Sequence, residues 1–148
     1  LDALMDKYEK SVGRNATLIL GLTPDPTGLI PIGDTQRLKE MGGEINRRFS
    51  SPIAKTLGQK KSLTLNLGKK QTVNYCIIQE NIKNGERIRQ YKIEAKVNGK
   101  WQSVCSGESV GHKRIEKFDP IEATALRLTI PESVALPDII NFSTYYIK

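Results

Sequence analysis

The chain has 148 residues, of which 38% are hydrophobic and 26% charged, and its formal net charge is +7. This predicts one domain of ordinary size with a real core and an appended piece, and the absence of an apolar run of roughly 20 residues excludes a membrane span. The basic residues alternate with apolar ones along predicted strands, which favours a solvated face over a nucleic-acid-binding surface.

The chain opens with an amphipathic helix. Its apolar residues recur at helical spacing and share one side: Leu1, Leu4, Met5, Tyr8 and Val12. Gly13 is suited to end this helix. The acidic residues Asp2, Asp6 and Glu9 lie on the other side, where we expect solvated charge.

A strand, a loop and a second helix are predicted next. Residues 16–20 are apolar on both faces, as in a strand covered on both sides. Residues 23–28 are rich in Pro, Asp and Gly and predict a rigid turn. Asp34 is suited to cap a helix that fades toward Asn46, because Gly42-Gly43 weakens it. Such a unit cannot bury both faces of its strand alone, so it is typical of part of a larger domain.

From residue 62 onward the hydrophobic period changes from helical to two. Residues 63–67 and 73–78 are predicted as successive strands joined by a turn at Gly68-Lys69-Lys70. Residues 91–97 lead into Asn98-Gly99, a strong hairpin signal, and return through Trp101, which we expect in the core. Further strands are expected at 114–118, 125–130 and 139–147, with a break at Asp119-Pro120. Short strands at regular spacing predict a β-sandwich.

This sequence has few of the residues that several kinds of reactive site require. His112 is the only histidine, which leaves little material for a Ser-His-Asp or Cys-His arrangement and none for a multi-histidine metal site. No glycine-rich phosphate loop is present. Cys76 and Cys105 both lie in predicted strands, which favours buried free thiols and leaves a disulfide open. We expect no cofactor.

Two successive stretches resemble known families. The first runs Tyr8, then Ser11-Val12-Gly13-Arg14-Asn15, Leu18-Ile19-Leu20, Pro24, Gly28-Leu29-Ile30, Asp34 and Arg37-Leu38, and resembles the end of the catalytic barrel of glycoside hydrolase family 29 α-L-fucosidases. The second includes Leu65-Asn66-Leu67-Gly68, Ile78-Gln79-Glu80-Asn81-Ile82, Gly85-Glu86-Arg87-Ile88, Gly99-Lys100-Trp101 and Gly111-His112-Lys113-Arg114-Ile115. It resembles a coagulation factor 5/8 C-type domain, which is a discoidin-like, galactose-binding-like jelly roll.

The resemblance implies a mainly β fold, an antiparallel jelly-roll β-sandwich preceded by a helix–strand–helix segment from the end of a (β/α) barrel. Residues 1–49 would be the end of the catalytic domain and residues 50–148 the sandwich. Gly21 stands where the family's strand commonly ends in Asn, so the polar contact of that Asn is absent. The stretch that usually carries a calcium site is reduced to residues 50–61, so no metal is expected.

Sugar binding by the sandwich would require an aromatic surface and polar groups aimed at vicinal hydroxyls. Eight residues are candidates: Glu80, Asn81, Arg87, Arg89, His112, Lys113, Arg114 and Tyr146. The alternative for the loop residues is surface charge with one or two loop-fixing hydrogen bonds. Tyr145 and Tyr146 are adjacent, so one should face inward and the other outward.

The resemblance implies that the parent protein is an α-L-fucosidase that removes terminal α-L-fucosyl groups with a retaining mechanism. The catalytic carboxylates of that mechanism would precede Leu1, so this chain alone should be inactive. The expected partners are fucosylated glycans or another carbohydrate and the catalytic domain of the same chain, with no nucleic acid and no membrane. The expected location is periplasmic or secreted. The alternative is a stand-alone carbohydrate-binding or adhesion module without catalysis.

Overall fold

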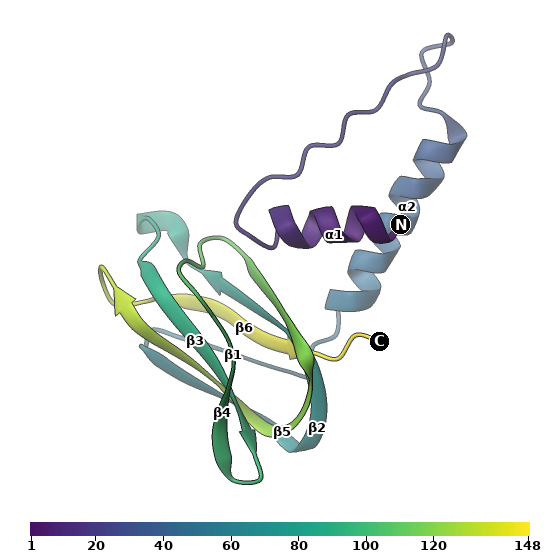
Figure 1. The fold of residues 1–148 in the computed structure, drawn as a ribbon. Coiled ribbons are helices and arrows are strands. Elements are labelled where there is room, and N and C mark those ends of the chain that lie inside the picture. The colour runs from purple at the N-terminus through teal and green to yellow at the C-terminus, as the bar shows by residue number, and fades with distance from the viewer.

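Two helices precede six strands in the computed structural model, which describes all of residues 1–148. The helices are α1 (Asp2–Ser11) and α2 (Ile32–Phe49). The strands are β1 (Ala54–Gly58), β2 (Ser62–Glu80), β3 (Ile88–Val97), β4 (Lys100–Gly107), β5 (Arg114–Ser133) and β6 (Ile139–Tyr145), and a short 3-10 helix, η1 (Ile82–Asn84), follows β2. Figure 1 shows α1, α2 and the long segment between them projecting from one end of the β-structure.

The strands form one antiparallel sheet in the order β1-β6-β2-β5-β3-β4. The β-structure has two layers, and the long strands β2 and β5 each contribute to both of them. The first part of β2 pairs with the last part of β5 beside β3, whereas its second part pairs with the first part of β5 beside β6. The sheet therefore folds over on itself, and the predicted antiparallel sandwich is confirmed.

The core lies between these two layers and follows the predicted alternation. The alternate residues Leu63, Leu65 and Leu67 of β2 are at most 7% exposed, while their neighbours are exposed. Seventeen buried residues form one cluster, and they come from β2, β3, β5 and β6 with Val110 from the loop before β5. Burial of this apolar surface is the main favourable term in the stability of the sandwich.

The β3–β4 hairpin forms where the sequence predicts it. Asn98 and Gly99 both have positive φ, at 49° and 82°, which matches the tight turn that Asn-Gly favours. Trp101 differs from the prediction, because it lies outside the core and is only half-buried. The Arg127 guanidinium stacks 4.3 Å from the centre of its ring, and this contact covers part of the indole.

Three details of the strand prediction were wrong. Gly68 does not end a strand. It has φ 75° inside β2, where the register with β5 shifts between Asn66 and Gln71. Asp119-Pro120 likewise lies inside β5. Both positions allow one long strand to bend and pass between layers. The short edge strand β1, which pairs with β6, had no clear period of its own and was not predicted.

The first helix matches its prediction, but the second is longer than expected. α2 begins at Ile32 with Pro31 at the N-cap, so Asp34 lies in the first turn and does not cap it. The helix also continues past Asn46 to Phe49. Glu44 bonds to the guanidinium groups of Arg47 and Arg48 in this last part, and these contacts contribute to its stability.

Residues 16–20 lie between the two helices as predicted, but they pair with no strand in this chain. Figure 1 shows this segment running away from the sandwich and returning at α2. Its apolar side chains are not covered on both sides, and Ile19 is 85% exposed. Two further apolar side chains beyond it, Leu29 and Ile32, are 67% and 84% exposed.

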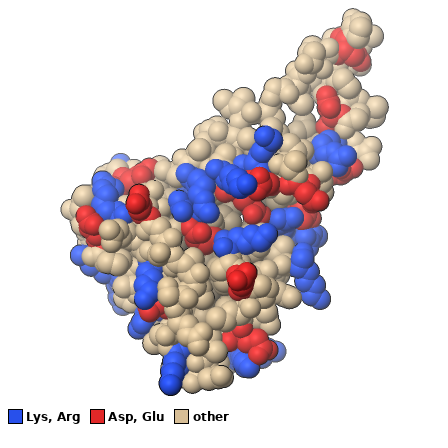
Figure 2. All heavy atoms as spheres, viewed as in Figure 1, with Lys and Arg blue, Asp and Glu red and all other residues tan.

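Charge is mixed over the surface. Figure 2 shows acidic and basic side chains interspersed on the β-structure, whereas much of the projecting segment is uncharged. Neither helix has the length and hydropathy that a membrane-crossing helix requires.

Candidate functional site

The residues that follow α1 join it to the start of β5. Gly13 accepts a hydrogen bond through its carbonyl from the amide of Ile115 at 2.9 Å, and the amide of Asn15 donates to the carbonyl of Lys113 at 3.0 Å. Arg14 forms an antiparallel bridge with Arg114 between them. We call residues 13–15 the clip, because they act as a short added strand that attaches the helical part to the sandwich.

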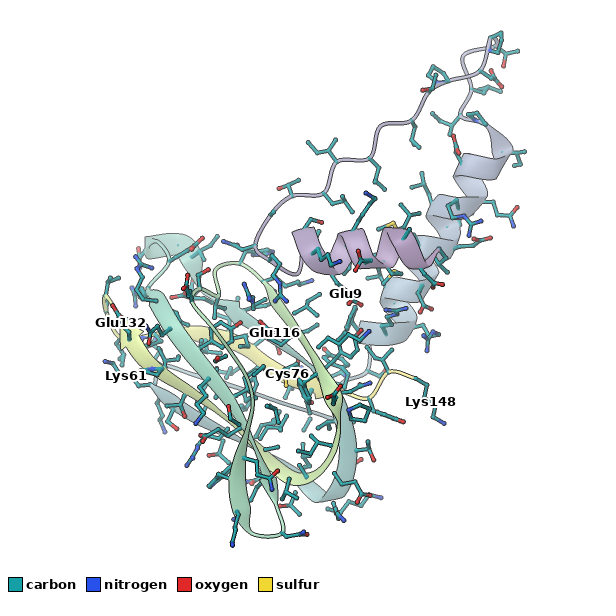
Figure 3. The ribbon with its side chains drawn as sticks, in the orientation of Figure 1. Glu9, Lys61, Cys76, Glu116, Glu132 and Lys148 are labelled. Atoms are coloured by element: carbon teal, nitrogen blue, oxygen red, sulfur yellow. The ribbon has the colours of Figure 1, made fainter.

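The side chain of Arg14 continues from the clip into a charged network inside the end of the sandwich. It donates to Oε1 of Glu116 at 2.9 Å and to the carbonyl of Ile115 at 2.8 Å. The same carboxylate oxygen accepts from Arg114 at 2.7 Å and from the Tyr91 hydroxyl. The Glu116 side chain is only 8% exposed, and Figure 3 places it between the strands at the end nearest α1. Glu116 therefore ties three elements together.

Asn15 connects the clip to two loops. Its backbone is left-handed, with φ 65°, a conformation that asparagine tolerates. Its amide nitrogen donates to Glu86 at 2.6 Å, and its amide oxygen accepts from the backbone of His112 at 2.7 Å. Gly111 lies directly beneath this amide, where a Cβ atom would overlap it. Any larger residue at position 111 would displace Asn15.

A second contact holds the helices against the sandwich. Phe49 at the end of α2 packs edge-on against Tyr75 and Tyr145, with ring centroids 6.0 and 5.6 Å away. Glu9 of α1 bonds to Arg48 at 2.9 Å and accepts from the Tyr75 hydroxyl at 3.3 Å. Figure 3 shows Glu9 on the side of α1 that faces the sandwich. The expectation that Glu9 is solvated was therefore wrong, because α2 supplies a partner that the sequence pattern of α1 does not reveal.

Four of the candidate sugar-binding residues lie in the loop between β2 and β3 or in the strand ends that flank it. Glu80 is 1% exposed and accepts a hydrogen bond from the backbone of Arg87 at 2.8 Å. The Asn81 side chain donates to Asp138 at 2.9 Å, and the Arg87 guanidinium donates to the carbonyl of Leu136 at 2.8 Å. Arg89, the second residue of β3, donates to the carbonyls of Glu86 and Ile88. These side chains hold loops together, which leaves fewer of their polar groups free.

The other four candidate sugar-binding residues lie in two separate places. The Glu80 amide donates to the Gly111 carbonyl at 3.0 Å, so the loop carrying His112, Lys113 and Arg114 lies beside the loop after β2. Arg114 is occupied by Glu116, whereas the side chain of His112 is exposed.

Tyr146 lies apart from these loops. It follows Tyr145, which pairs with Tyr75, whereas Glu80 pairs with Ile139. Five residues of strand separate Tyr75 from Glu80, or roughly 17 Å. Tyr146 is 43% exposed and Tyr145 is 6% exposed, so the inward and outward assignment of this pair is correct. Tyr146 would belong to a different contact surface from His112.

Glu80 offers a test through pH, because its second oxygen, Oε2, has no hydrogen-bond partner. Burial raises the pKa of this carboxyl above its usual 4.5. Between the usual and the raised pKa, the folded chain retains a proton that the unfolded chain has lost. The free energy of unfolding should therefore fall as pH rises through this window.

Glu80→Gln is expected to remove that decline, because the amide oxygen can still accept from Arg87 while nothing titrates. Urea unfolding of both chains between pH 4 and 8 would measure it, with the exposed Glu108→Gln as control. Parallel pH curves for the wild type and Glu80→Gln would contradict the expected role of the carboxyl.

The remaining chemistry of the chain is limited. No three His, Cys, Asp or Glu side chains lie close enough together to hold a metal ion. Both cysteines are free, as the sequence favoured. Cys76 is buried, and burial raises the pKa of the Cys105 thiol to about 12. Neither thiol is activated for nucleophilic chemistry.

Known proteins are similar to both the helical part and the β-structure of this chain. The F5/8 type C domain model matches residues 34–140. A candidate α-L-fucosidase 1 of Oryza sativa subsp. japonica is 30% identical over 96% of this chain and 34% of its own length. The crystal structure of a candidate α-L-fucosidase from Bacteroides thetaiotaomicron VPI-5482 is 85% identical, with a TM-score of 0.98 over 99% of this chain and 34% of that one. The chain thus spans about a third of these relatives.

A carbohydrate-binding module is similar to part of this chain. The family 32 module of C. perfringens NanJ, solved in complex with galactose, is 30% identical, with a TM-score of 0.51 over 57% of this chain and 66% of that one.

Proposed function

This chain belongs to the F5/8 type C domain family, and from that premise we propose that it forms the C-terminal region of an α-L-fucosidase. The parent protein would hydrolyse terminal α-L-fucosyl linkages of glycans with retention of configuration. Retention requires two carboxyl groups about 5 Å apart. No such pair is assigned in this chain, so they would come from the rest of the catalytic domain. The similarity to α-L-fucosidases over the whole chain supports this proposal.

The observation that carries the proposal is the exposed apolar segment held between the clip and α2. Ile19 and Ile32 are 85% and 84% exposed in this chain, although full burial of each side chain would contribute about 2 kcal/mol. A catalytic barrel of the same protein would cover them. The sandwich would then serve as its support, because the clip and the aromatic contact of Phe49 fix the segment relative to the β-structure.

A carbohydrate-binding role is the second candidate for the sandwich. It is favoured by the likeness to the galactose-bound module and by the exposure of His112 and Tyr146. The eight candidate residues remain a prediction for that role. Calorimetric titration of this chain with fucose, galactose and fucosylated oligosaccharides addresses it. Saturable binding that weakens in His112→Ala or Tyr146→Ala would favour this role. If no heat of binding is measured, support of the barrel remains the only role proposed for the sandwich.

The enzymatic proposal is tested by expressing the full-length parent protein and measuring release of fucose from an aryl α-L-fucoside. We expect turnover by the parent and none by this chain alone, which is the matched control. An inactive parent protein would refute the assignment. We further propose that the protein is periplasmic or secreted, where fucosylated glycans occur, and cell fractionation of the source organism would test this.

A further inference from the structure

The direction of the segment between the helices is fixed by the clip. Asn15 is bonded to the sandwich loops, and the chain then runs away from the sandwich through residues 16–20 (Figure 1). It turns at residues 23–30, which we call the tip, and α2 brings the chain back to the sandwich at Phe49. Five extended residues span roughly 17 Å. The start of the segment therefore lies at the sandwich and the tip lies far from it.

The tip keeps its shape through its own hydrogen bonds. Oδ1 of Asp25 accepts from the Thr27 amide at 2.8 Å, from the Thr27 hydroxyl at 2.6 Å and from the Leu29 amide at 3.2 Å. The Asp25 amide donates to the Leu29 carbonyl at 2.8 Å, which closes the turn. Gly28 has φ 83°, a conformation that glycine adopts without strain. The tip is thus folded without support from the rest of the molecule.

In parallel (β/α) barrels the reacting groups lie at the carboxyl ends of the strands, on the face formed by the loops that follow them. If residues 16–20 are a strand of such a barrel, as the proposed function implies, Gly21 and the tip lie on the catalytic face. The clip and the sandwich then lie at the opposite end of that strand. The loops around His112 would be separated from the reaction by the length of the barrel.

We propose that the tip is a specificity element of the catalytic face, where it contacts the sugars to which fucose is attached. This inference rests on the proposed function. The terminal fucose would lie close to the strand ends, whereas the tip projects several residues beyond Gly21. Its exposed groups are mainly uncharged, with Leu29 67% exposed, and they suit the apolar face of a pyranose. A rigid tip makes such contacts without the cost of ordering a loop.

The test uses the full-length parent protein with two substrates, an aryl fucoside and a branched fucosylated trisaccharide. Asp25→Ala removes the acceptor of three hydrogen bonds and disorders the tip. We expect kcat/KM for the trisaccharide to fall by about tenfold, which corresponds to about 1.4 kcal/mol. The aryl fucoside should change by less than about twofold, because it has no further sugar to contact.

Asp25→Asn is the matched control, because Oδ1 of asparagine can accept the same three bonds, and it should retain both activities. Glu108→Gln, at an exposed position between β4 and β5, should also leave both unchanged. Equal loss on both substrates by Asp25→Ala, no loss on either, or failure of Asp25→Asn to rescue would overturn the inference. A wild-type parent inactive on both substrates would instead refute the proposed function.

Discussion

Gly13→Ala is expected to detach α1 from the sandwich and to lower the free energy of unfolding by about 2 to 3 kcal/mol. A Cβ atom on residue 13 would overlap the backbone carbonyl of Glu9 and lie 2.9 Å from Cβ of Ile115. Neither neighbour can rotate away, because the first is helix backbone and the second sits where β5 accepts the clip. The whole clip must shift, and the bond between Ile115 and residue 13 is lost with it.

Urea unfolding and amide hydrogen exchange of α1 would measure this effect. Gly42→Ala is the matched control, because nothing lies within 4 Å of a Cβ at that exposed helical position. The same substitution there should stabilise the chain, by up to about 1 kcal/mol. If Gly13→Ala left both stability and exchange in α1 unchanged, the clip would not be what holds the helix.

The sequence predicted the elements whose signal is local. Asn98-Gly99 needs only its own backbone conformation to make a hairpin, and the period of two in residues 63–67 reports the two faces of one strand. Gly68 and Asp119-Pro120 carry equally strong turn signals, yet both lie inside long strands. Pairing with a distant strand overrides them, and a local pattern does not contain that partner.

The prediction of the candidate site was limited in the same way, because its residues are brought together from distant parts of the chain. Sequence reasoning selected the two loops that the structure brings together, those of Glu80 and His112, because both combine glycine with polar residues. It missed Arg14, Asn15 and Glu116, which hold the loops to the helical part. Arg14 and Glu116 are 102 residues apart, so no spacing rule connects them. The resemblance did include Gly13-Arg14-Asn15, and the structure supplies a physical reason for that motif in the clip.

Glu116→Gln is expected to cost about 3 kcal/mol of unfolding free energy, because it removes the charge that two guanidinium groups share in a nearly buried place. Arg14 and Arg114 both bond to Oε1 of Glu116, and the Tyr91 hydroxyl donates to the same atom. Glutamine keeps the size and one acceptor oxygen, so the loss reports charge and not a cavity. Urea unfolding followed by Trp101 fluorescence would measure it.

Glu122→Gln provides the comparison, since Glu122 is paired with Lys70 but its side chain is 62% exposed. An exposed pair is screened by solvent, so we expect a change of less than about 1 kcal/mol there. The two substitutions are chemically identical and differ only in burial and in the number of cations served. Equal effects would mean that the Glu116 network contributes little to joining the clip to the sandwich, and the backbone bonds of the clip and the aromatic contact of Phe49 would then hold the helical part.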